Sequence, residues 1–147
     1  MSTLERAIAI AAEAHAGQVD KAGAPYILHP LRVMMSVSGN NERVVAVLHD
    51  VLEDCPEWTP ERLRAEGFGD HIIEALDRLT RRKGESYEDF IRRCQGPLSQ
   101  RVKIADLHDN MDPIRTTLIP PNPERNLRYS AALRMLTEPA TSAPGTE

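Results

Sequence analysis

The stretch VVAVLHDVLED, residues 44–54, joins an unbroken apolar run to a cluster of ionisable side chains. In a helix, residues four apart share a face, so His49 would lie above Glu53 and Asp50 above Asp54. The flanks of this run favour a helix over residues 41–54 instead of a buried strand, and its apolar character predicts a central position. Clustered polar groups are costly to desolvate unless something binds them, and a divalent metal ion is a natural candidate.

The remainder of the chain carries helix signals separated by turns, and strand signals are nearly absent. Ser2 has capping-box form, Thr59 and Ser86 resemble caps, and Pro30 suits the first position of a helix. Pro113 and the cluster at residues 120–123 are expected to break the chain into a loop. The pattern predicts an all-α bundle with further helices over residues 2–17, 31–37, 59–66, 70–80, 86–94, from 97 or 98 through Asn110, and 124–136.

Length and composition describe one ordinary globular domain. The chain has 147 residues, of which 41% are hydrophobic and 27% charged, enough for one domain with a sizeable core. We expect this domain over residues 1–137, followed by a disordered tail over residues 138–147 that is rich in Pro, Ser, Thr and Gly. The net charge of -4 argues against a general nucleic-acid binder, but it leaves room for a small anion in a local basic pocket.

The cysteines and the hydropathy of the chain indicate the cellular compartment in which we expect it. Cys55 and Cys94 form no metal-binding spacing and suit a reducing environment. No apolar run approaches the ~20 residues of a membrane helix, and no signal peptide is visible. We therefore expect a cytoplasmic protein with no membrane or nucleic-acid partner, and the sequence does not determine its oligomeric state.

Four residues form a plausible metal-binding set: His29, His49, Asp50 and Asp106. Imidazole together with carboxylate suits Mn, Fe, Co, Ni or Zn, whereas an all-oxygen set would suit Mg or Ca better. Adjacent helical residues are offset by ~100°. His49 and Asp50 can therefore converge on one ion only if other helices bring His29 and Asp106 to it.

The order His29, His49-Asp50, Asp106 is the signature of the HD-domain metal-dependent phosphohydrolases. A closer resemblance, covering about residues 4–136, is to the hydrolase domain of the RelA/SpoT alarmone enzymes. It is carried by AHAGQ at 14–18, GAPYILHP at 23–30, LHDVLED at 48–54, and VKIAD at 102–106 with Asn110. No synthetase or regulatory domain is expected in what remains, so the chain resembles the stand-alone small alarmone hydrolases, including the metazoan SpoT homologue.

That resemblance implies an all-α HD-domain helical bundle that removes the 3′-pyrophosphate from guanosine tetra- or pentaphosphate. It implies a single Mn²⁺ ion on the four residues above. It further implies that Glu53 and Asp54 are catalytic and that Asn110 contacts the nucleoside. This agrees with elementary chemistry, since a bound metal ion acidifies water and neutralises phosphate charge, and a nearby carboxylate can take a proton.

A polyphosphate substrate also needs cations. Arg81 or Arg82 could serve in place of Lys83, and Lys103 could partner the metal cluster or contact phosphate. Tyr129 follows Arg125 by one helical turn on the same face. The residues that resemble phosphate-contacting positions of the small hydrolases are Lys21, Lys83, Arg125 and Tyr129.

The chain departs from the family pattern at Asp20, where these hydrolases usually carry a basic residue beside the nucleobase. A guanidinium stacks on a purine and a carboxylate does not, so an adenine alarmone remains open. His108 and Asp109 also depart from the pattern and could add polarity near the site or face water. Two alternatives stay open: a phosphatase for another nucleotide, such as a 2′-phosphate dinucleotide or a nucleoside monophosphate, and a non-catalytic nucleotide sensor.

Overall fold

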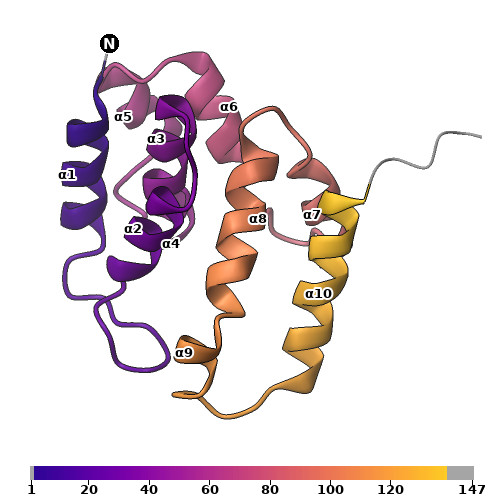
Figure 1. Ribbon diagram of the computed structural model, residues 1–147. Coiled ribbons are helices and arrows are strands. Elements are labelled where there is room, and N and C mark those ends of the chain that lie inside the picture. Colours follow the sequence, from indigo (N-terminus) through magenta and orange to yellow (C-terminus); the bar gives the residue numbers. More distant parts are fainter. Residues whose placement is uncertain (1, 139–147) are drawn as a thin grey trace, which may run out of the picture.

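The computed structural model describes residues 2–138, and the regular secondary structure in that range is helical (Figure 1). An isolated antiparallel bridge between Val19 and Pro25 closes the loop after the first helix. The all-α prediction is confirmed, whereas the expected tail lies outside the described residues except for Glu138. The helices are α1 (Leu4–Ala14), α2 (Leu28–Met35), α3 (Asn40–Leu48), α4 (Val51–Asp54), α5 (Pro60–Ala65), α6 (Asp70–Arg78), α7 (Tyr87–Arg93), α8 (Ser99–Asn110), α9 (Pro113–Thr116) and α10 (Pro123–Thr137).

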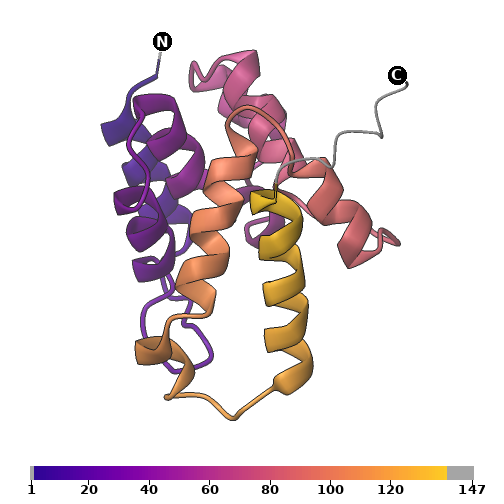
Figure 2. The same cartoon turned by 45° about the vertical axis from the view of Figure 1, so that its right-hand side comes forward.

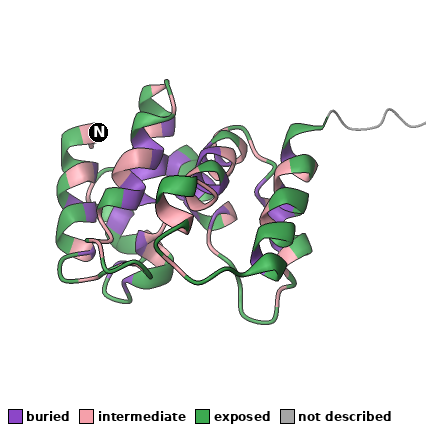
Figure 3. Ribbon diagram, turned by 60° about the horizontal axis from the view of Figure 1, so that its bottom comes forward, coloured by how far each residue is buried: buried purple, intermediate pink, exposed green. Residues whose placement is uncertain are grey.

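Helix α3 is the centre of the bundle and packs against α1, α2, α6 and α8. Helix α8 joins the α1–α3 group to α10, which runs beside it (Figures 1 and 2) and packs in turn against α7. Residues 44–48 are all buried, as the apolar run predicts, and burial concentrates where the helices meet (Figure 3). No helix among residues 2–138 is both long enough and apolar enough to cross a bilayer.

The core is built from aliphatic side chains that are fully removed from water. Ile10, Leu48, Leu76 and Leu107 each have 0% exposure, and burying such a side chain contributes about 1.5–3 kcal/mol of transfer free energy. In α6 the predicted helical spacing is confirmed, because Ile72, Ile73 and Leu76 all face the core.

Several helix ends differ from the sequence-based expectation. Thr3, not Ser2, caps α1, since its side chain accepts from the Arg6 amide at 3.1 Å. Pro30 lies in the third position of α2, which it tolerates because first-turn amides have no intrahelical partner. Pro113 does not break the chain but opens α9, behind an Asp112 cap that accepts from the Ile114 amide at 2.9 Å.

The helix predicted over residues 41–54 is interrupted: α3 ends at Leu48 and α4 begins at Val51, while His49 and Asp50 between them keep right-handed helical backbone angles. The carbonyl of Ala46 accepts from the His49 amide at 3.4 Å and from the His49 imidazole Nδ1 at 2.6 Å. A side chain that bonds its own backbone in this way competes with the regular helical ladder. The interruption between α3 and α4 therefore falls at the two potential metal ligands.

Truncating the core at Leu76→Ala is expected to destabilise the fold by about 2–5 kcal/mol, because the lost side chain leaves a cavity under α3. Leu127→Ala in α10, where the leucine is 70% exposed, is the matched control and should change stability by less than about 0.5 kcal/mol. Urea unfolding followed by circular dichroism measures both. Equal losses in the two variants would contradict this placement of the core.

Candidate metal centre

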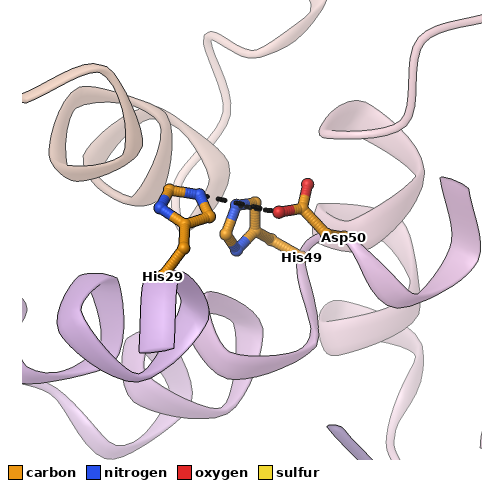
Figure 4. Close-up of side chains that lie close together, drawn as sticks. All are labelled: His29, His49 and Asp50. Carbon is orange, nitrogen blue, oxygen red and sulfur yellow. Dashed lines mark ion pairs between the residues drawn. The ribbon is translucent and has the colours of Figure 1, made fainter. Parts of the chain in front are cut away.

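Three of the predicted ligands converge at the break between α3 and α4. His29 comes from α2, His49 ends α3, and Asp50 precedes α4, and one potential ligand atom from each lies within 4.8 Å of the others (Figure 4). The Oδ2 atom of Asp50 is 3.1 Å from His49 Nε2 and 3.6 Å from His29 Nε2. Both imidazoles are 3% exposed, so this is an interior cluster and not surface polarity.

Asp106 of α8 brings the fourth predicted group to the same point. Its Oδ1 atom lies 2.8 Å from His29 Nε2 and 3.3 Å from His49 Nε2. Two atoms bonded to one ion at ~2.1 Å stand about 3 Å apart when the bonds are perpendicular. The spacing of these nitrogen and oxygen atoms therefore fits a shared divalent ion.

Hydrogen bonds behind the cluster fix the orientation of the ligands. The Ala46 carbonyl can only accept, so His49 Nδ1 carries the proton and its Nε2 lone pair faces the cluster. Tyr26 donates its hydroxyl to Asp50 Oδ2 at 2.6 Å. Partners of this kind hold metal ligands in place, and their loss weakens metal binding.

Lys103 compensates the buried charge of Asp106. Its Nζ donates to Asp106 Oδ2 at 2.8 Å, and Asn110 donates to Oδ1 at 3.2 Å. Burial opposes ionisation of Asp106, but Lys103 and the two imidazoles hold its pKa well below the usual value. Of the two roles open to Lys103, its geometry favours that of partner to the metal cluster.

The cluster forms one wall of a cavity of about 450 Å³ bounded by residues 19–26, α8, α9 and α10. Arg125 lines it at 7% exposure, and among the described residues its side chain has no hydrogen bond or ion pair. Lys83 and Asp54 are not part of the lining, and Arg81 lines the cavity where Lys83 was expected. Predicted residues that do line it, besides the four ligands, are Lys21, Glu53, Asn110, Arg125 and Tyr129.

Glu53 reaches the cavity beside the cluster, whereas Asp54 lies toward Tyr26 and His15. Partial desolvation raises the pKa of Glu53, and the negative charge of Asp50 adds to the effect. Partial desolvation and Asp50 also raise the pKa of Asp54. Glu53 is thus placed at the cavity by the short helix α4.

Several residues of the site escaped the sequence analysis. Tyr26 lies in a recognised motif, but no spacing rule links it to Asp50. Arg115 came from a segment expected to be a loop, yet it donates to Asp109 at 2.8 Å and to Asn110 at 3.1 Å. Arg115 also lies 3.5 Å from Asp20, which the sequence analysis had singled out and which accepts amide hydrogen bonds from residues 22 and 24. Tyr87 and Arg128 also line the cavity.

A protein-family model described as an HD domain matches residues 7–115. The chain belongs to the HD-domain family. Proteins of this family bind divalent metal ions, and the possible His29–His49–Asp50 site lies within the matched range. The expected HD-domain bundle is thereby confirmed.

The similar proteins have names that refer to reactions of guanosine phosphates. A probable GTP pyrophosphokinase of Mycobacterium leprae is 33% identical over 82% of this chain, which matches 17% of the relative. Two proteins named guanosine-3′,5′-bis(diphosphate) 3′-pyrophosphohydrolase, from Aquifex aeolicus and Vibrio cholerae, are 31% identical over 77% and 91% of this chain. The HD domain matches only 17% and 19% of their lengths.

A solved structure has the same fold. It belongs to a metazoan orthologue of SpoT that is described as hydrolysing ppGpp and playing a role in starvation responses. It superimposes with a TM-score of 0.72, covering 90% of this chain and 84% of the other at 18% identity. At this identity the likeness concerns the fold, which it confirms over nearly the whole HD domain.

Tyr26→Phe is expected to weaken metal binding about 10-fold, because Asp50 loses a 2.6 Å hydrogen bond that orients it. Tyr87→Phe is the matched control, since the Tyr87 hydroxyl is buried and has no hydrogen-bond partner among the described residues. Titration of metal-free protein with Mn²⁺ or Zn²⁺ measures both affinities. An unchanged affinity in Tyr26→Phe would remove the orienting role of this hydroxyl.

Proposed function

We propose that this HD domain is a metal-dependent hydrolase that removes the 3′-pyrophosphate from guanosine tetra- or pentaphosphate alarmones. The observation that carries the proposal is the placement of the four-residue metal cluster and Glu53 beside a cavity that also contains Arg125, which is buried and has no ion pair within residues 2–138. Relatives named for this reaction support it, as does the metazoan SpoT orthologue of the same fold, which is described as hydrolysing ppGpp. A nucleotide is the expected small-molecule partner.

His29, His49, Asp50 and Asp106 would hold the metal ion. The mixed nitrogen and oxygen donors favour a transition metal such as Mn²⁺ over Mg²⁺ or Ca²⁺. When bound, such an ion would acidify a water molecule and neutralise phosphate charge at this wall of the cavity.

Glu53 would then accept the proton of the attacking water. It lines the cavity without being one of the proposed ligands, and its raised pKa makes its carboxylate a stronger base than an ordinary glutamate carboxylate. Asp54 does not line the cavity. Its catalytic role stays a prediction, with Tyr26 as its nearest link to the metal cluster.

The phosphates would bind toward α10. Arg125, Arg128 and Arg81 have no ion pair with a carboxylate among the described residues, and all three line the cavity with Tyr129. A buried guanidinium without a partner is costly, so an anionic ligand stabilises it. Lys21 approaches from the opposite rim, and the role of Lys83 stays a prediction.

Asn110 and Asp20 are the two residues that the sequence analysis linked to recognition of the nucleoside. Asn110 lines the cavity, but its amide already bonds Asp106 and Arg115. Asp20 is engaged by its own loop and by Arg115, so it is less free to recognise a base than the sequence suggested. Preference for guanine over adenine, like the cytoplasmic location, stays a prediction.

Chromatographic product analysis with the guanine and adenine 3′-pyrophosphate nucleotides side by side, in the presence of Mn²⁺, tests the reaction. The expected products are inorganic pyrophosphate and the nucleoside 5′-diphosphate from the tetraphosphate, or the 5′-triphosphate from the pentaphosphate. Chelation of the metal, His49→Ala and Asp50→Ala should each abolish turnover, because each removes the ion or one of its ligands. Release of orthophosphate from other nucleotides would favour a phosphatase, and tight binding without product would favour a sensor.

Glu53→Gln should retain the metal and lose activity by about 10²–10⁴-fold, because the amide cannot accept the proton. Glu57→Gln, at an exposed position beyond α4, is the matched control and should keep wild-type rates. Metal content by elemental analysis and single-turnover rates separate the two contributions. Full activity in Glu53→Gln would assign proton transfer elsewhere.

A further inference from the structure

We propose that Asp109 is a positioning residue that holds His29 in the orientation and tautomer needed to bind metal. The inference rests on the proposed metal site but not on the identity of the substrate. Its starting observation is the 2.6 Å contact between Asp109 Oδ2 and His29 Nδ1. The side chains are 8% and 4% exposed, so water competes little for this hydrogen bond.

Two carboxylates of helix α8 contact the two nitrogens of the His29 imidazole. Asp106 and Asp109 are three residues apart in α8, a spacing that places them on neighbouring positions of the helix surface. Asp106 Oδ1 lies 2.8 Å from Nε2, and Asp109 Oδ2 lies 2.6 Å from Nδ1. The two nitrogens of a ring point in different directions, so Asp109 stands behind His29 and is not a further ligand of the same ion.

Two arginines fix the Asp109 carboxylate. Arg32 of α2 donates its Nε to Oδ1 at 2.8 Å, and Arg115 of α9 donates its Nη1 to Oδ2 at 2.8 Å. The pair neutralises the buried charge and prevents the carboxylate from rotating away from His29. An ionised carboxylate can only accept, so His29 Nδ1 must carry the proton and Nε2 keeps its lone pair for the ion.

The two metal-binding histidines are thus oriented by different means. His49 uses the backbone carbonyl of Ala46, which no substitution removes. At Nδ1, His29 contacts side chains, Asp109 at 2.6 Å and Arg115 Nη1 at 3.3 Å, and of these only the Asp109 carboxylate can accept its proton, so its orientation can be tested by mutation. His108, the residue before Asp109, is exposed, and its side chain forms no hydrogen bond among the described residues, which makes it a matched control.

The test measures Zn²⁺ affinity of the metal-free chain by competition with a chelator, without any nucleotide. Asp109→Ala should weaken binding by about 10–100-fold. Asp109→Asn, whose amide oxygen can still accept but carries no charge, should give a smaller loss, and His108→Ala should give none. Long-range ¹⁵N NMR of the Zn²⁺-loaded chain should show His29 protonated at Nδ1 in the wild type and this signal shifted in both Asp109 variants.

The outcomes are distinguishable. A wild-type chain that binds no Zn²⁺ would overturn the proposed metal site itself. Wild-type binding with unchanged affinity in Asp109→Ala and Asp109→Asn, or an unshifted His29 Nδ1 signal, would overturn the positioning role alone. If Asp109→Ala fails to fold, the nearly isosteric Asp109→Asn decides the question, because a merely structural residue would lower thermal stability without moving the His29 signal.

Discussion

The structure depends on charge compensation within one buried cluster, which contains two imidazoles and two carboxylates. Each carboxylate is held by a donor: Lys103 for Asp106 and Tyr26 for Asp50, at 2.8 and 2.6 Å. Buried charges that lack such partners cost several kcal/mol each. The helices that meet here, α2, α3, α4 and α8, therefore supply both the charged groups and the groups that compensate them.

The break at His49 and Asp50 shows how local geometry serves this cluster. In a continuous helix the two side chains would diverge by ~100°. The imidazole bond to the Ala46 carbonyl ends α3, and both residues then lie outside regular helix. Their facing atoms, His49 Nε2 and Asp50 Oδ2, stand 3.1 Å apart. The predicted helix is thus present as two pieces, and the interruption between them carries the two potential ligands.

The sequence predicted the helices that depend on local patterns of residues. Apolar spacing located α6, and the caps at Thr59 and Ser86 located α5 and α7. It could not locate contacts made by residues distant in sequence, such as Arg32 with Asp109, which are 77 positions apart. Arg115 was missed because the segment after Pro113 was expected to be a loop, whereas it forms α9 and brings Arg115 to Asp109 and Asn110. The four proposed ligands were selected by residue order and family resemblance, and the convergence of their atoms required the structure.

The charges around the cavity separate into two groups, and this separation bears on the kind of ligand. Lys103 and Arg115 are engaged by Asp106 and Asp109, so they compensate internal charge. Arg128 instead lies 5.1 Å from the Tyr87 ring and Arg81 lies 5.7 Å from it, contacts that hold a guanidinium without neutralising it. The α10 side thus retains positive charge, while Glu53 and the metal cluster occupy the other side. A molecule that spans the cavity with phosphates on both sides satisfies this pattern better than a neutral nucleoside does.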